Sequence, residues 1–95
     1  MTDVVSGTLD ANAEEVGPIW VERSATVIAV STNTITVTPH VCHERAGSYA
    51  PLTGSAMTAS GGVQVNGPCW VKAVASAVSG GGTSLVSIRA LKVGV

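Results

Sequence analysis

The chain contains no phenylalanine, and two tryptophans and one tyrosine are its only aromatic residues. Its core must therefore be built from aliphatic side chains, which bury less apolar area per residue than aromatic rings do. Charged residues are also scarce, because they make up 12% of the 95 residues and leave a formal net charge of −1. A small domain with so modest a core is a natural candidate for stabilisation by self-association.

The same absences exclude two classes of partner. A net charge so close to zero provides no basic footprint for nucleic acid and no polybasic patch for an anionic membrane. No apolar run approaches the roughly 20 residues that a membrane-spanning helix needs. Residues 1–5 lack the basic and apolar regions of a secretory signal. We therefore expect synthesis in a cytoplasm, and no binding to nucleic acid or membrane.

The only two cysteines are Cys42 and Cys69, and a reducing compartment favours free thiols over a disulfide. With His40 and His43 they form the one group that suggests metal binding. The spacing lacks the CxxC pair of structural zinc sites, and an extended strand places His40 and Cys42 on one face but His43 on the other. We expect no metal and no cofactor, and interpret the group as two surface histidines and a small buried thiol.

A catalytic Cys–His pair is not indicated either. Cys42 and His43 are neighbours in the sequence, whereas catalytic pairs are usually assembled from distant segments with a third, orienting group. Glu44, in the same predicted loop, is the one nearby residue for that third role. The sequence therefore predicts a protein that is not an enzyme.

Regular alternation is the main structural signal in the chain. In residues 34–41, TITVTPHV, apolar and polar residues alternate strictly, which is typical of a strand with one face on a core. Pro39 cannot donate a ladder hydrogen bond, so we expect this strand to lie at an edge or its pairing to stop there. Residues 25–30, ATVIAV, are almost wholly apolar and predict a strand that is covered on both sides.

Similar runs, separated by turn residues, fill most of the chain. The apolar phase changes near Ala90 and Leu91, which predicts a β-bulge there. Such short strands at roughly ten-residue spacing indicate an all-β fold, a single antiparallel β-sandwich or jelly-roll-like barrel of about seven to eight strands, with residues 1–95 as one domain. The predicted strands are residues 4–9, 19–22, 25–30, 34–41, 49–52, 63–65, 70–78 and 84–93.

The order of these segments resembles small β-sandwich proteins of tailed-bacteriophage particles. The segments that carry the resemblance are SGTLDANAEEV, ATVIAVS, TITVTPHV, GSYAPL and VQVNGPCWVKAVASAVSGGGTSLVSIRAL. The chain departs from the usual pattern where residues 43–47 replace an Asp-Gly turn, where Tyr49 replaces a common Trp, and where Lys72 replaces an Arg. The resemblance implies a structural role in the virion, as a head decoration (cement) protein or as a fibre or spike base.

The resemblance further implies a capsid decoration protein that binds and stabilises the outer surface of a phage head. Its partner would be the major capsid protein lattice, and it would form a homo-oligomer, with a trimer favoured. Two alternatives stay open. One is a tail- or fibre-associated or host-surface binding module, and the other is a small metal-binding protein that uses His40, Cys42, His43 and Cys69.

Large side chains and the chain ends supply the candidate interface residues. Trp20 and Trp70 are the best anchors, because large aromatics dominate interface energetics. A core position is the competing role for each, and it is the one we expect. Exposed edge strands offer a second means of attachment to neighbours. The candidate interface residues are Val4, Val5, Trp20, Trp70, Val93 and Val95.

Overall fold

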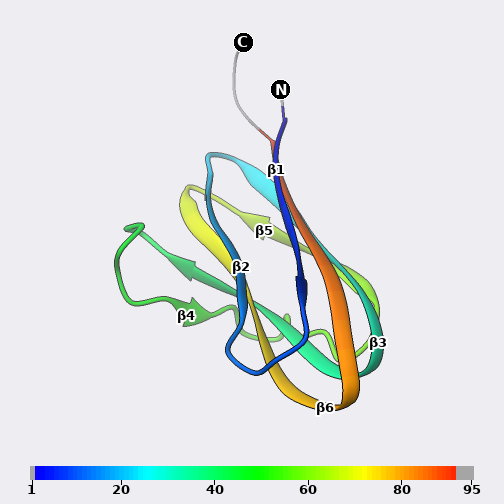
Figure 1. Cartoon of the computed structure of the whole chain (residues 1–95). Coiled ribbons are helices and arrows are strands. Elements are labelled where there is room, and N and C mark those ends of the chain that lie inside the picture. Colours follow the sequence, from blue (N-terminus) through cyan, green and yellow to red (C-terminus); the bar gives the residue numbers. More distant parts are fainter. Residues whose placement is uncertain (1, 92–95) are drawn as a thin grey trace.

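The computed structural model describes residues 2–91, which form six β-strands and no helix (Figure 1). All strand pairs are antiparallel and belong to one open sheet, so the all-β prediction is confirmed. The sheet does not close into a barrel, and the described residues contain six strands rather than seven or eight. No helix that could cross a membrane occurs in this part of the chain. The strands are β1 (Thr2–Leu9), β2 (Glu15–Val21), β3 (Ser24–Cys42), β4 (Ala50–Pro51), β5 (Gly61–Asn66) and β6 (Cys69–Leu91).

The strand count is lower because two pairs of predicted strands are continuous. β3 joins the predicted strands 25–30 and 34–41, and β6 joins 70–78 to the strand that begins at residue 84. Both bend midway while they stay paired with each other, with register shifts around Thr34. Asn33 and Gly81 adopt positive φ angles of 59° and 74° at this bend. Gly82 lies so close to the Thr34 carbonyl oxygen that no Cβ fits there.

The bend divides the sheet into two halves. In the first half, residues 84–91 of β6 lie between β1 and the beginning of β3, whose outer neighbour is β5. In the second half, residues 69–74 of β6 lie between β2 and the end of β3, whose outer neighbour is β4. Both long strands turn at the bottom of the view in Figure 1. At the opposite end, the Gly67 N–H donates to the Arg23 carbonyl (2.7 Å) and ties the two halves together.

Alternate residues of both halves point inward and form one aliphatic core. The expectation that aliphatic side chains build this core is confirmed. Within the described range 2–91, no aromatic residue belongs to the cluster of buried side chains. The members are Leu9, Val16, Val21, Ala25, Val27, Ala29, Ile35, Val37, Met57, Val65, Cys69, Val71, Ala73, Ala75, Val86, Ile88 and Ala90.

The expected core position of the two tryptophans is wrong. Trp70 lies between the buried Cys69 and Val71, so the alternation of the strand turns its ring away from the core. Trp20 pairs with Trp70 across the ladder and shares its side of the sheet. Both rings are half-buried on the outer surface of the second half.

Two predictions for the first half are also wrong. Residues 25–30 are covered on one side only, because Ile28 and Val30 are 41% and 57% exposed. The expected bulge near Ala90 and Leu91 is absent, since both pair in unbroken register with β1 and β3. Leu91 is 48% exposed, so the change of apolar phase reflects an aliphatic side chain on the outer surface.

Pro39 lies in the interior of the sheet, contrary to the expected edge position, although the pairing of β3 with β4 does end next to it, at His40. It pairs with Ala73 on β6, and its carbonyl accepts a hydrogen bond from the Leu52 N–H on the other side (2.9 Å). The N–H and C=O groups of one strand residue point to the same neighbour. Another residue at this position would therefore direct its N–H toward β4. Because Pro39 has no N–H, a hydrogen bond is missing on that side only, and the ladder with β6 keeps all its hydrogen bonds.

Candidate functional site

The three aromatic side chains gather on the outer surface of the second half. Trp20 and Trp70 are direct cross-strand partners, with ring centroids 5.5 Å apart and ring planes inclined by 58°. Tyr49 comes from the segment that joins β3 to β4. Because β6 turns Trp70 and Lys72 to the same side, these rings lie beside a lysine. We call the surface formed by Trp20, Arg45, Tyr49, Trp70 and Lys72 the aromatic face.

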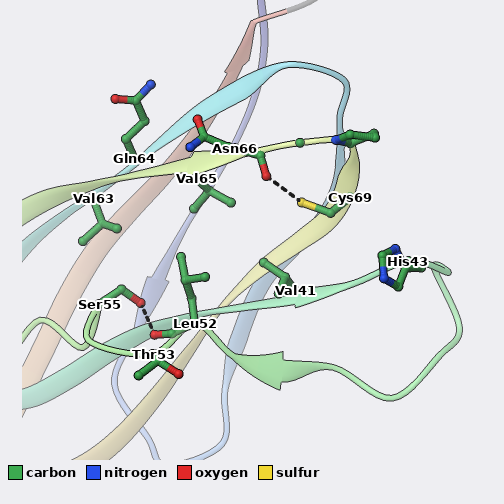
Figure 2. A pocket seen from close by; sticks show the side chains of 12 residues that line it. Val41, His43, Leu52, Thr53, Ser55, Val63, Gln64, Val65, Asn66 and Cys69 are labelled. Atoms are coloured by element: carbon green, nitrogen blue, oxygen red, sulfur yellow. Dashed lines mark hydrogen bonds between the residues drawn. The ribbon is translucent and has the colours of Figure 1, made fainter.

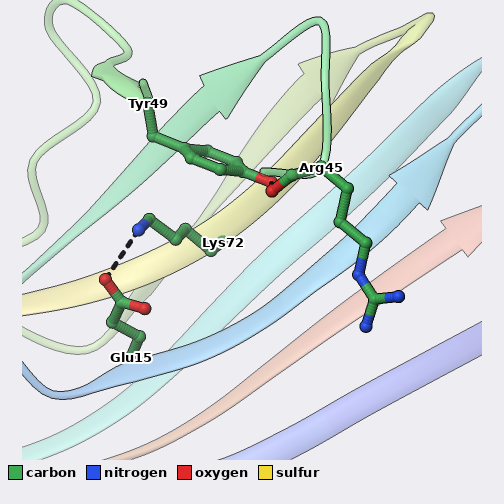
Figure 3. Close-up of polar contacts among 4 residues, drawn as sticks. All are labelled: Glu15, Arg45, Tyr49 and Lys72. Carbon is green, nitrogen blue, oxygen red and sulfur yellow. Dashed lines mark hydrogen bonds and ion pairs between the residues drawn. The ribbon is translucent and has the colours of Figure 1, made fainter. Parts of the chain in front are cut away.

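Two cations contact the aromatic rings of this face, and Figure 3 shows both of them with Tyr49 and Glu15. The Arg45 guanidinium lies 5.7 Å from the Trp70 ring centroid, and Lys72 Nζ lies 4.5 Å from that of Tyr49. The Tyr49 hydroxyl donates to the Arg45 carbonyl (2.8 Å), and Lys72 also forms an ion pair with Glu15 (2.6 Å). These contacts hold the rings in a fixed arrangement, as an interface anchor requires.

Partial burial sets the charge state of the neighbouring groups. His40 lies directly opposite Lys72 on the same side of the sheet. Desolvation and the positive charge of Lys72 lower the pKa of His40, although Glu15 acts weakly in the opposite direction. Burial raises the pKa of Tyr49. At neutral pH both side chains are therefore uncharged, and the cations and Glu15 carry the charge of this region.

The aromatic face offers hydrogen-bond donors to a partner. Neither indole N–H has a hydrogen-bond acceptor among residues 2–91, and no buried side-chain donor in that range is left unsatisfied. Both indole N–H groups are therefore accessible to solvent. Arg45 is exposed, and its guanidinium carries further donors. Tryptophan, tyrosine and arginine are the residue types most enriched at the energetic centres of protein interfaces.

A groove of about 580 Å³ opens between β4 and β5, where the two halves of the sheet do not pair (Figure 2). Its floor is aliphatic and its rim is polar. Its volume lies within the range of small-molecule sites, and an extended segment of a partner would also fit such a groove. The floor residues are Val41, Leu52, Val63 and Val65, and His43, Gln64 and Asn66 line the rim.

Three of the four candidate metal ligands, Cys42, His43 and Cys69, line one cavity of about 280 Å³, whereas His40 does not. Cys69 is buried and its thiol lies 3.6 Å from the Asn66 carbonyl oxygen, whereas Cys42 is half-buried and His43 is exposed. Burial raises the pKa of the Cys69 thiol. Both cysteines are free. Within residues 2–91 no group of three or more His, Cys, Asp or Glu side chains is arranged to hold a metal ion.

The aliphatic interface candidates are dispersed. Val4 is 53% exposed on β1, whereas Val5 is half-buried and packs against the core. Val93 and Val95 lie outside the described residues.

A second surface was not predicted from the sequence. Large aliphatic side chains, 41–57% exposed, all lie on the outer surface of the first half. The signal was present in residues 25–30, whose outward positions are apolar, but it was interpreted as burial on both sides. We call this surface, formed by Val4, Ile28, Val30, Leu85 and Leu91, the apolar face.

No protein-family model matches the chain, and neither a curated protein nor a solved structure matches it. The two outer faces and the phage-protein resemblance are therefore the basis for a functional proposal.

Proposed function

We propose that this chain is a structural virion protein of a tailed bacteriophage. It acts as a capsid decoration (cement) protein that binds and stabilises the outer surface of the head. In this role the folded sheet works as a two-layer β-sandwich, and its partner is the lattice of the major capsid protein. It has no enzymatic activity, and it resides in the virion after synthesis in the host cytoplasm. Self-association as a trimer belongs to the same proposal.

The aromatic face carries this proposal. Trp70 contacts both the Trp20 ring and the Arg45 guanidinium, so an aromatic–cation cluster lies on the outer surface of the sheet. Such clusters, with fixed rings and accessible donors, supply most of the binding energy in many protein interfaces. The low charge of the chain also suits docking on a flat partner, because few ions must lose their hydration.

Binding to expanded capsids that lack the protein tests the proposal. The protein should sediment with such capsids at saturable stoichiometry. Arg45→Ala removes a donor-rich exposed side chain and should weaken binding about tenfold, within the usual range for an interface arginine. Arg23→Ala makes the same change of charge in the exposed turn between β2 and β3, outside the aromatic face, and should bind as the wild type does. Equal binding losses for both variants would count against the aromatic face, and no sedimentation of the wild type against the decoration role.

A tail-associated or host-surface binding module is the second candidate. Trp20 and Trp70 lie on the surface, where exposed aromatic rings also serve as platforms for sugars. Incubation with host cells and with purified host surface glycans separates the candidates. A host-surface module would bind the cells through Trp70 and would not bind capsids.

A further inference from the structure

We infer that the apolar face is the surface through which copies of this chain associate with one another. Val30 and Leu85 are direct partners across the ladder between β3 and β6, and Ile28 lies two residues from Val30 on the same side. Val4 and Leu91 continue the surface toward the other end of the same half. Ile28, Val30 and Leu85 therefore form one group, and Val4 and Leu91 form a second group beyond Ser87 and Arg89 on the same outer surface of three neighbouring strands. This inference rests on the self-association in the proposed function and names its surface, but it does not require that the partner of the other face is a capsid.

The chemistry of the surrounding positions favours a neutral partner. Between the aliphatic residues lie Ser6, Thr8, Thr26 and Ser87, which are small and uncharged. Arg89 is the one charged residue among the outward-facing residues of β6 from Leu85 to Leu91. A surface with so little charge selects no oppositely charged partner, but it is compatible with a copy of itself.

The area is sufficient for association. The whole outer surface of the first half, which includes β5 beside the three strands of the apolar face, spans four strands about 4.8 Å apart over about eight residues at roughly 3.3 Å each, or about 500 Å² per copy. Two such surfaces bury about 1,000 Å² in total, close to the lower bound for a specific protein interface.

The position of the face is compatible with the rest of the molecule. The two halves of the sheet face each other across the core, so their outer surfaces point in opposite directions. A copy that covers the apolar face therefore leaves the aromatic face open to a different partner.

Sedimentation equilibrium and light scattering on the purified full chain test the inference. We expect a mass above that of one 9.5 kDa chain at micromolar concentration. Leu85→Asp places a charge at the centre of the apolar face and should yield a monomer. Ser76→Asp adds the same charge to an exposed position of β6 in the other half, and should keep the wild-type mass. Circular dichroism and urea unfolding show whether each variant folds.

Each outcome decides the matter. A wild-type monomer at 100 μM, or a Leu85→Asp protein that keeps the wild-type mass, would overturn the inference. If Leu85→Asp does not fold, Val30→Thr replaces it, because threonine keeps the shape and β-propensity of valine. Val30→Thr should raise the dissociation constant about tenfold, and an unchanged constant would overturn the inference. A monomer that still binds capsids, but loses that binding when Leu85 is changed, assigns the face to the lattice instead.

Discussion

Trp20 on β2 and Trp70 on β6 lie directly opposite each other on the outer surface of the sheet, with ring centroids 5.5 Å apart. They are the largest side chains in the protein, and neither belongs to its core. Their contact joins two strands that are far apart in the sequence. It therefore links the stability of the second half to the surface that we propose for partner binding.

The two tryptophans should be energetically coupled. Trp20→Ala and Trp70→Ala each remove a half-buried ring and should cost about 1–2 kcal/mol of unfolding free energy. Because each single variant already loses the ring contact, the double variant should cost about 0.5–1.5 kcal/mol less than their sum. Urea denaturation of the four proteins measures the coupling. A coupling near zero would show that the rings stand side by side without stabilising each other.

Lys72 should contribute more to stability than its partner Glu15. Lys72→Met removes both the ion pair and the contact with the Tyr49 ring, whereas Glu15→Gln removes the ion pair alone. The Glu15 side chain is 42% exposed, so solvent screens the pair and we expect about 0.5 kcal/mol for Glu15→Gln and about 1 kcal/mol for Lys72→Met.

Salt separates the two contributions of Lys72. In 1 M NaCl the cost of Glu15→Gln should vanish, because the Debye length falls to about 3 Å. Lys72→Met should keep part of its cost. Urea denaturation at low and high salt provides the comparison, and a larger cost for Glu15→Gln than for Lys72→Met would contradict the arrangement in Figure 3.

The bend between the halves should be intolerant of any side chain at Gly82. A Cβ there would overlap the Thr34 carbonyl oxygen, which is held in the backbone of the neighbouring strand. Gly82→Ala should therefore destabilise the protein by about 2–4 kcal/mol. Gly61→Ala is the matched control, because no atom lies within 4 Å of its added Cβ, and it should be neutral or slightly stabilising. Thermal unfolding monitored by circular dichroism distinguishes the two, and equal melting temperatures would mean that the chain bends elsewhere.

The protein should become less stable as the pH falls below 6.5, the ordinary pKa of a histidine side chain. The pKa of His40 in the folded protein is lowered from 6.5 by desolvation and by Lys72, so the unfolded chain binds a proton more readily. The contribution of His40 is therefore fully present above pH 6.5 and is lost as the pH falls toward the pKa of the folded state. Urea denaturation between pH 7.5 and 5.5 measures the loss.

Two variants identify the group responsible. His40→Asn should flatten the pH dependence, and Lys72→Met should weaken it, because the positive charge of Lys72 contributes to the lowered pKa of His40. If the His40→Asn protein kept the full pH dependence, another group would have to be its source.

The local pattern of this sequence predicted strands well but not their continuity. In residues 34–41 the alternation correctly placed Ile35 and Val37 inward and Thr36 and Thr38 on the other side. Residues 70–78 and 84–93 were predicted as two strands, yet positive φ angles at Gly80 and Gly81 bend a single strand that stays paired with β3 on both sides of the bend. Local composition shows that the chain changes direction, whereas only the pairing partner decides whether the ladder continues.

The two tryptophans of the candidate site were predictable from the sequence, but its other members and its place were not. Trp20 and Trp70 were identified as anchors from their size, although their contact depends on the register of β2 against β6. Arg45 and Tyr49 gave no separate signal, because the fold of the 43–48 segment brings them to the face. The apolar residues at 28 and 30 were recognised, but an apolar residue in a strand does not reveal whether a core or a partner covers it.

The central claim is that this protein holds the subunits of a phage head together, and heat disruption of expanded capsids tests it most directly. Calorimetry of capsids with and without saturating protein should show that the bound protein raises the temperature of shell disruption by several degrees. A disruption temperature that stays unchanged at full occupancy would contradict the claim.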